Sequence, residues 1–202
     1  MNILALDTTG RDCAVALRRM GQADLIICEP IGRGHAERLA PMVSEILEQA
    51  GLEAGNIDRI GVTIGPGSFA GTRVGVAFAR GLALSANARA FGISNLAIWA
   101  AAQDTRPLAV LHDAKRGEVI LQVWQDDAPD APERLSVEEA RSRLADLTLT
   151  GPGAVLFGGE AVLSLDLFRL LDLTAAADAA QSPPSPFYAR PPDAKLPGGI
   201  DP

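Results

Sequence analysis

The sequence contains only two cysteines, Cys13 and Cys28, and only two histidines, His35 and His112. Two cysteines are too few for a disulfide framework, and no histidine accompanies them at zinc-finger spacing. The positions three and four residues beyond His35 hold an arginine and a leucine, which are not metal ligands. The sequence therefore predicts two buried, reduced thiols and no metal site.

Aromatic side chains, basic charge and long apolar runs are also scarce. Aromatic residues make up 4% of the 202 residues and hydrophobic residues 48%, which predicts cores of Ala, Leu, Val and Ile. Acidic residues outnumber basic ones 25 to 18, and this net charge of −7 opposes broad contact with a phosphate backbone. Arg80 and Arg89 interrupt the most apolar region, and no signal-peptide pattern opens the chain. We expect a cytoplasmic protein without membrane contact that meets RNA only indirectly.

The first half of the chain reads as strands and helices in alternation. Short apolar runs and helical periodicity predict strands over 2–7, 13–18, 24–29, 58–64 and 90–93, and helices over 39–50, 70–85 and 95–102. Pro41 is expected in a first helical turn, which starts that helix near residue 39 or 40. Three strands before the first helix indicate an antiparallel meander that opens a mixed α/β sheet.

A second unit follows a junction at residues 103–107. The pattern predicts a hairpin of strands 108–114 and 117–124, a helix over 136–145, a strand into a turn over 153–159 and a helix over 160–173. Proline is frequent from residue 182 onward, which predicts an extended, partly ordered tail. We therefore divide the chain into domains 1–103 and 104–181 and a tail 182–202.

The segment GPGSFAGTR, residues 65–73, is the most motif-like stretch. It does not fit a Walker loop, because Ala70 and Gly71 stand where Gly and Lys belong, and its third glycine comes one residue late for a dinucleotide fingerprint. It lacks the flanking pattern of a nucleophile elbow around Ser68. We expect Ser68 to cap the helix that follows.

Small residues recur every four positions in that helix, at Gly71, Gly75, Ala79 and Ala83. A stripe of this kind lets another element approach closely. The alternatives are packing on the chain's own sheet and a helix-to-helix contact with a second subunit, in which the apolar helix 39–50 would take part.

Three polar or glycine-containing turns are expected at strand ends: Asp7-Thr8-Thr9, Asp113–Gly117 and Gly158-Gly159. Each has an ordinary turn as its simplest interpretation. Together they are typical of a cleft between two related domains that meets phosphate or a hydrated metal. His112 beside Asp113 reads as a solvated turn pair or as a catalytic group.

Five segments resemble the TsaB (YeaZ) family: ILALDTTG, GHAERLAPMVSEIL, IGPGSFAGTRVGVAFARGLAL, DAKRGEV and PFYARPPDAK. The resemblance implies two actin-like (ribonuclease-H-like) domains, the first with a mixed five-stranded sheet and the second smaller. It also implies a non-catalytic subunit in the formation of N6-threonylcarbamoyladenosine at position 37 of tRNA. Ala70 and Thr72 depart from the family pattern, in which we expect threonine and leucine.

In that family the larger TsaD subunit holds the metal and the catalytic site, and a TsaE ATPase joins the pair. The resemblance implies that ATP, Mg and metal bind in the partner subunits, that this chain alone binds no cofactor, and that it self-associates as a homodimer when the partner is absent. Docking would use the two helices after the third and fourth strands. The predicted interface residues are Leu39, Met42, Val43, Ile46, Gly67, Ser68, Phe69, Gly71, Gly75 and Ala79. A vestigial nucleotide cleft would hold Asp7, Thr8, Thr9, Gly158 and Gly159.

Two enzymatic functions remain as alternatives to the assembly role. The three turns favour an ATP-dependent phosphotransferase of the actin-like class, although no convincing general base accompanies them. A protease or amidase built on Ser68 is the third alternative.

Overall fold

The structure of the protein, a computed structural model, describes residues 1–126 and 128–188. Its larger sheet has the strand order β3-β2-β1-β4-β5. The first three strands are antiparallel, whereas β4 is parallel to β1 and β5 is parallel to β4. The strands are β1 (Ile3–Asp7), β2 (Cys13–Arg18), β3 (Leu25–Glu29), β4 (Arg59–Thr63) and β5 (Arg89–Ile93). The predicted meander and mixed five-stranded sheet are confirmed.

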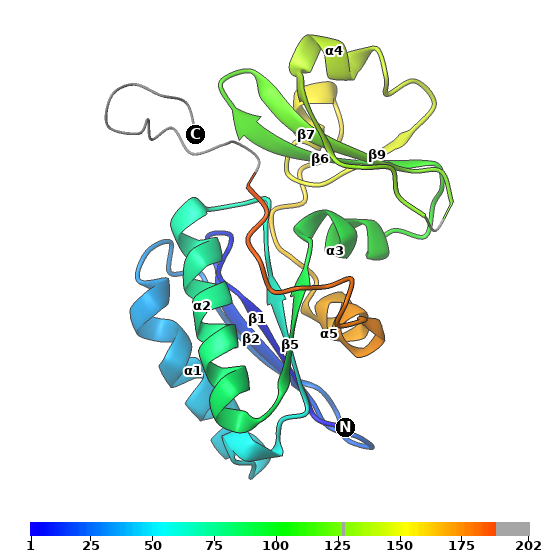
Figure 1. Ribbon diagram of the computed structural model, residues 1–202. Coiled ribbons are helices and arrows are strands. Elements are labelled where there is room, and N and C mark those ends of the chain that lie inside the picture. The colour runs from blue at the N-terminus through cyan, green and yellow to red at the C-terminus, as the bar shows by residue number, and fades with distance from the viewer. Residues whose placement is uncertain (127, 189–202) are drawn as a thin grey trace, which may run out of the picture.

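Helices cover both faces of this sheet (Figure 1). On one face α1 (His35–Ala50) and α2 (Phe69–Ala86) enclose a core with β1, β2 and β4, and the short η1 (Ala54–Asn56) joins α1 to β4. On the other face lies α5 (Leu167–Ala176), while α3 (Asn95–Ala101) follows β5 toward the second unit. The sheet is therefore the central layer of this unit, with β1 buried and the edge strand β3 partly exposed.

The helix α1 begins at His35, so the expected start near residue 39 is wrong. Pro41 lies inside the helix rather than in its first turn. It removes one helical hydrogen bond. Burial of Leu39, Met42 and Ile46, each at most 1% exposed, outweighs that loss.

The second sheet has the order β8-β7-β6-β9, which repeats the first without its fifth strand. Its strands are β6 (Leu108–Lys115), β7 (Glu118–Trp124), β8 (Glu133–Ser136) and β9 (Thr148–Thr150), and α4 (Val137–Arg141) packs on β7 and β8. The predicted hairpin and the smaller size of the second unit are confirmed.

Other expectations for the second unit are wrong. Residues 154–157 form the 3-10 helix η2 (Ala154–Phe157) instead of a strand, α4 ends at Arg141, and the sequence did not predict β8 and β9. The helix expected from residue 160 begins at Leu167, because the Asp166 carboxylate caps it by accepting the Phe168 and Arg169 N–H groups.

The helix α5 corrects the predicted domain 104–181. It buries Leu170 and Leu171 against β1, β2, β4 and β5 of the first unit. The approach is close, since a Cβ on Gly61 of β4 would lie 1.8 Å from the Thr174 hydroxyl oxygen. The first unit is therefore discontinuous in sequence.

Residues 182–188, which we call the C-terminal strap, lie along the first sheet (Figure 1). The Gly92 N–H donates to the Ser182 carbonyl at 3.0 Å, and the Phe187 N–H donates to the Ile64 carbonyl at 2.8 Å. The start of the predicted tail is thus tied to β5 and to the residue after β4. Residues 189–202 of that tail lie outside the described residues.

Candidate functional site

The Asp7-Thr8-Thr9 turn at the end of β1 is a closed hydrogen-bond network. One carboxylate oxygen of Asp7, Oδ1, accepts from the Thr9 N–H at 2.9 Å and from the Thr9 and Thr63 hydroxyls at 2.7 Å each. The Asn95 amide donates to the Thr9 hydroxyl oxygen at 2.7 Å. All four side chains are buried, so this network joins β1, β4 and α3 inside the protein.

The glycine-rich turn covers this network from outside. The Ser68 N–H donates to the Thr9 carbonyl, and the Thr8 hydroxyl donates to the Gly71 carbonyl, both at 2.7 Å. A Cβ on Gly67 would lie 2.6 Å from the Thr9 carbonyl oxygen, and one on Gly71 2.0 Å from that of Thr8. The two glycines therefore allow the turn to lie directly on the β1 turn.

This packing corrects the predicted nucleotide cleft at Asp7, Thr8 and Thr9. Burial raises the pKa of Asp7 above its ordinary value, although its hydrogen bonds to Thr63 and Thr9 oppose that rise. A phosphate or hydrated metal needs open ligand oxygens, and here the chain's own turn occupies the approach. The residues present do not fit a nucleotide at this turn.

The other two predicted turns lie in the second unit. Asp113 and Lys115 form an ion pair at 2.6 Å at the end of β6. Gly158 caps η2, and Gly159 lies against Ala154, so this glycine pair follows a 3-10 helix and not a strand. Among the described residues no hydrogen bond or ion pair joins the glycine pair to Asp7, and the three-turn cleft stays a prediction.

Sequence reasoning missed Gly151 and Gly153, which follow β9. A Cβ on Gly151 would lie 2.5 Å from the Leu111 carbonyl oxygen, and one on Gly153 3.0 Å from the backbone of β6. Their Gly-Pro-Gly sequence is the signal that would have found this close approach.

His112 is not a solvated turn residue. Its ring stacks on Trp99, with centroids 5.9 Å apart and planes 18° apart, and burial lowers its pKa to about 4. His35 lies 3.2 Å from the Asp12 carbonyl through Nε2. Over residues 1–126 and 128–188, no three His, Cys, Asp or Glu side chains gather as metal ligands would.

The predicted docking residues divide into two groups. Gly67, Ser68 and Phe69 are exposed at the start of α2. The others are buried against the chain's own sheet: Leu39, Met42, Val43, Ile46, Gly71, Gly75 and Ala79. The expectation that the stripe of small residues in α2 is a free surface is therefore wrong, because β1 and β4 occupy it.

The outward faces of α1 and α2 nevertheless carry several small exposed residues among larger polar ones. Their exposed positions include Ala36, Ala40, Ala70, Ala77 and Gly81. Two large apolar side chains of α2 are also exposed, Phe69 at 52% and Leu84 at 87%. These residues recur at spacings of three, four and seven, a signal that was present in the sequence beside the more regular buried stripe.

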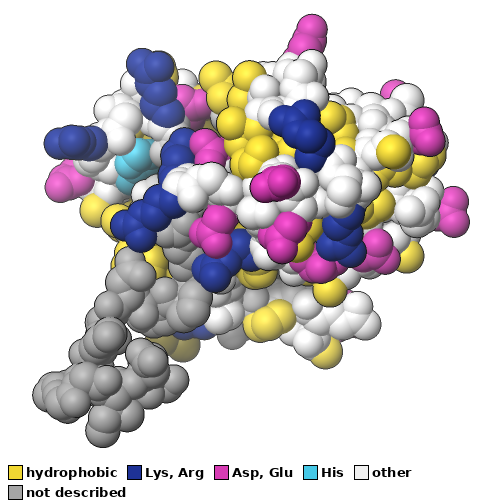
Figure 2. Space-filling view, turned by 90° about the horizontal axis from the view of Figure 1, so that it is seen from above, with side chains coloured by type: hydrophobic (Ala, Val, Ile, Leu, Met, Phe, Trp, Pro, Cys, Tyr) yellow, Lys and Arg dark blue, Asp and Glu magenta, His cyan; other side chains and the backbone are white. Residues whose placement is uncertain are grey.

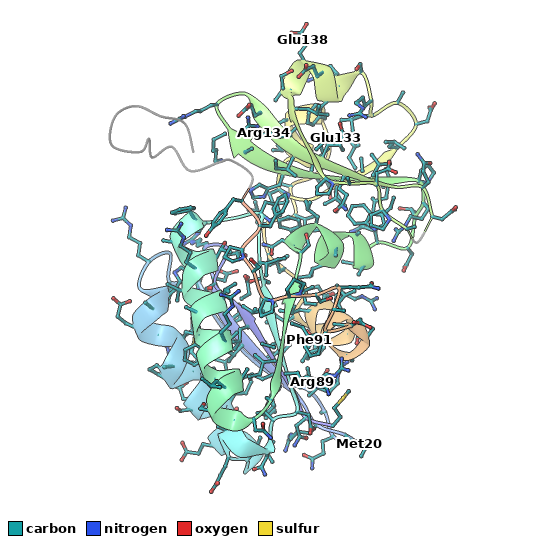
Figure 3. The ribbon with its side chains drawn as sticks, in the orientation of Figure 1. Met20, Arg89, Phe91, Glu133, Arg134 and Glu138 are labelled. Atoms are coloured by element: carbon teal, nitrogen blue, oxygen red, sulfur yellow. The ribbon has the colours of Figure 1, made fainter. Side chains whose placement is uncertain are left out.

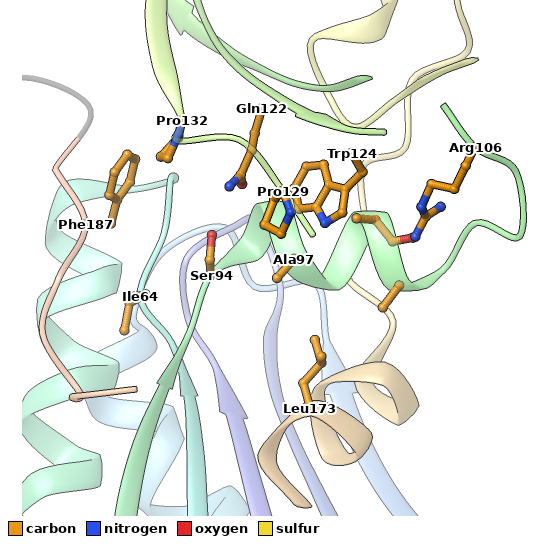
Figure 4. Close-up of a pocket in the computed structure, with 12 residues that line it drawn as sticks. Ile64, Ser94, Ala97, Arg106, Gln122, Trp124, Pro129, Pro132, Leu173 and Phe187 are labelled. Atoms are coloured by element: carbon orange, nitrogen blue, oxygen red, sulfur yellow. The ribbon is translucent and has the colours of Figure 1, made fainter. Parts of the chain in front are cut away.

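A cavity of about 510 Å³ separates α3 from β7, and the C-terminal strap borders it. Its lining is mostly apolar and includes Trp124 and Phe187. Figure 4 shows the Ser94 hydroxyl and the Gln122 amide pointing into it from opposite sides. Arg106, which also lines it, donates to the carbonyls of Gln103 and Thr105. The cavity contains no carboxylate among its described lining residues.

Charges of both signs are interspersed on the face seen from above (Figure 2), and side chains such as Glu138 project from the second unit into solvent (Figure 3). That face offers no continuous basic track for a phosphate backbone. None of the helices formed by the described residues is both long and apolar enough to cross a membrane.

Comparison with known proteins identifies relatives of this chain. Residues 26–155 match the family model described as TsaD, tRNA N6-adenosine threonylcarbamoyltransferase. The tRNA threonylcarbamoyladenosine biosynthesis protein TsaB of Escherichia coli is 39% identical over 134 residues, 63% of this chain and 56% of that protein. A tRNA N6-adenosine threonylcarbamoyltransferase of Erythrobacter litoralis is 37% identical over 71 residues, 35% of this chain and 21% of that protein. The match thus spans about half the length of the curated TsaB relatives.

A solved structure extends the likeness to the whole fold. YeaZ from Pseudomonas aeruginosa superimposes with a TM-score of 0.79 at 28% sequence identity, covering 93% of this chain and 99% of that one. The expected fold class is confirmed by this match and by the two sheets. The chain belongs to the TsaB (YeaZ) family, within the wider group that the TsaD family model describes.

Proposed function

We propose that this protein is a non-catalytic assembly subunit that binds a TsaD-type threonylcarbamoyltransferase in the formation of N6-threonylcarbamoyladenosine at position 37 of tRNA. The observation that carries the proposal is the set of small and apolar residues exposed on the outward surface of α1 and α2. The names of the curated relatives support the pathway. The proposed role includes a TsaE-type ATPase as a further partner, a cytoplasmic location and an indirect contact with tRNA.

The closed Asp7 network supports the non-catalytic part of the proposal. Its carboxylate is buried and hydrogen-bonded to Thr9 and Thr63, so it cannot reach a substrate without opening of the turn that covers it. In the proposed complex the metal and the nucleotide would belong to the partner subunits.

Docking on α1 and α2 would use Ala70, Ala77 and Gly81 in place of the buried stripe. These positions let a second helix approach closely, whereas a long side chain there would hold it away. In the absence of the partner, the same surface would pair with a second copy of the chain. One molecule cannot use that surface for both at once.

Light scattering after size exclusion, with and without the TsaD-type protein of the same organism, tests this surface. We expect Ala77→Arg to abolish both the homodimer and the heterodimer and to leave the fold intact, since Ala77 is exposed. Ala179→Arg, at an exposed turn position, is the matched control. A heterodimer that forms equally well with Ala77→Arg would refute docking on this surface.

A reconstituted modification assay tests the role itself. Threonylcarbamoylation of tRNA is measured with the TsaD-type and TsaE-type subunits and the enzyme that supplies threonylcarbamoyl-adenylate, each left out in turn. We expect no sustained modification without this chain. Equal product in its absence would contradict the proposal.

The cavity between the two units keeps the ATP-dependent phosphotransferase as a second candidate, because its volume of about 510 Å³ would admit a small molecule. Calorimetry with Mg-ATP on the isolated protein decides between the two. Tight binding that is lost in Gln122→Ala, in the lining of the cavity, would favour the enzyme, and the absence of heat would favour the assembly role.

A further inference from the structure

An exposed arginine of α2 lies over one aromatic ring and beside a second. The guanidinium carbon of Arg73 lies 3.7 Å from the centroid of the Phe69 ring and 5.4 Å from that of Tyr188. Its Nε donates to the Tyr188 hydroxyl at 2.9 Å, and the two ring centroids are 5.3 Å apart. Phe69 is 52% exposed and Tyr188 40% exposed, so this cluster lies on the surface.

The C-terminal strap brings Tyr188 to this place. The strap is anchored next to it, because the Phe187 N–H donates to the Ile64 carbonyl and the Phe187 side chain packs against the apolar cluster of α3, β6 and β7. The cluster therefore joins the start of α2 to a residue 115 positions later in the chain. A surface arginine normally loses rotamer freedom when it binds a partner, and here the two rings have already restricted it.

The charge of this region is positive in an acidic protein. Helix α2 contains Arg73 and Arg80 and no acidic residue, whereas the whole chain carries a net charge of −7. Within residues 1–126 and 128–188, the two terminal nitrogens of Arg73, Nη1 and Nη2, have no hydrogen-bond or ion-pair partner. They leave the planar edge of the guanidinium available for a carboxylate, which it binds through two parallel hydrogen bonds.

We propose that Arg73, Phe69 and Tyr188 form a preorganised receptor for an aspartate or glutamate side chain of the TsaD-type subunit. The inference rests on the proposed function and makes the C-terminal strap part of the docking surface. A protein partner is favoured over RNA, because α2 exposes Phe69 and Leu84 and contains two basic residues. Aromatic and arginine side chains of this kind dominate the energetics of protein interfaces.

Isothermal titration of this protein with the TsaD-type subunit tests the receptor. We expect Arg73→Gln to weaken binding by about 10- to 100-fold, because a charge-assisted pair is lost. Tyr188→Phe removes only the hydroxyl that orients Arg73, and we expect a weakening of about 3- to 10-fold. In the Arg73→Gln background Tyr188→Phe should have no further effect, since the two act as one unit.

Arg89→Gln is the matched control, because Arg89 is an exposed arginine at the opposite end of the first unit (Figure 3). It should change the affinity by less than about twofold. Unchanged thermal unfolding of all variants would show that the fold is intact. An Arg73→Gln affinity equal to that of the wild type would overturn the receptor.

Two further outcomes separate the possible failures. If Ala77→Arg abolishes the heterodimer and Arg73→Gln does not weaken it, the proposed function stands and the receptor is wrong. If Arg73→Gln instead weakens only the binding of tRNA to the assembled complex, the cluster contacts nucleic acid and the inference is overturned. If the wild-type protein produces no heat with the TsaD-type subunit, both proposals fail together.

Discussion

The same substitution at two glycines of α2 should have opposite effects on stability. A Cβ on Gly71 would lie 2.0 Å from the Thr8 carbonyl oxygen, whereas a Cβ on Gly81 meets nothing within 4 Å. In Gly71→Ala the helix must move away from β1, at a cost of about 1–3 kcal/mol or more for overpacking. The Thr8 hydroxyl bond to the Gly71 carbonyl is then strained or lost, at about 1 kcal/mol.

Alanine also favours a helix over glycine by about 1 kcal/mol, and this gain applies at both positions. Gly71→Ala should therefore destabilise the protein by about 1–3 kcal/mol, and Gly81→Ala should stabilise it by up to about 1 kcal/mol. Urea denaturation of the two variants and the wild type measures the free energies of unfolding. If Gly71→Ala stabilised the protein as Gly81→Ala does, the small-residue stripe would not be packed on the sheet and our assignment of the outward face would be wrong.

Three further outcomes follow from the buried groups. Burial raises the pKa of Asp7 in the folded state, so its contribution to stability falls as pH rises from about 4 through that raised pKa. Asp7→Asn removes this loss, so in urea denaturation the free energy of unfolding of the variant should rise relative to that of the wild type as pH rises. If the two free energies changed in parallel with pH, the predicted direction would be wrong. Burial lowers the pKa of His112 from 6.5 to about 4, so acidification across this range should lower the free energy of unfolding by up to about 3 kcal/mol. The His112 ring should remain neutral at pH 5.5 by NMR, and a midpoint near 6.5 would disprove its burial. Cys28 is exposed and Cys13 is buried, so a thiol reagent should modify Cys28 in the native protein and Cys13 only in denaturant. Equal modification of both thiols in the native protein would contradict the burial of Cys13.

Periodicity was sufficient for the first unit because its elements are long and each has one buried face. The apolar positions of α1 and α2 and the meander of β1 to β3 follow directly from the pattern. The second unit was less predictable, because β9 has only three residues and is held by its pairing with β6. The apolar run 154–157 resembles a strand, but Gly153 lies against the backbone of β6 and the chain turns there into η2.

The candidate site shows a different limit of sequence reasoning. The spacing of Gly71 and Gly75 correctly indicated a close approach of another element, but spacing alone does not say which element approaches. The contact between Arg73 and Tyr188 was not predictable either, because it depends on the course of the strap after α5. Tertiary contacts of this kind leave no periodic signal in the residues that make them.

The discontinuity of the first unit has a consequence for its synthesis on the ribosome. The apolar face formed by Ile3, Ala5 and Phe91 is complete once β5 has emerged, yet α5, which covers it, is made only after the whole second sheet. At about 5–20 residues per second, that face waits on the order of several seconds without its own cover. A nascent chain stalled before residue 167 should therefore present a bare sheet to chaperones, and the second unit is an insertion that the first must tolerate before it can close.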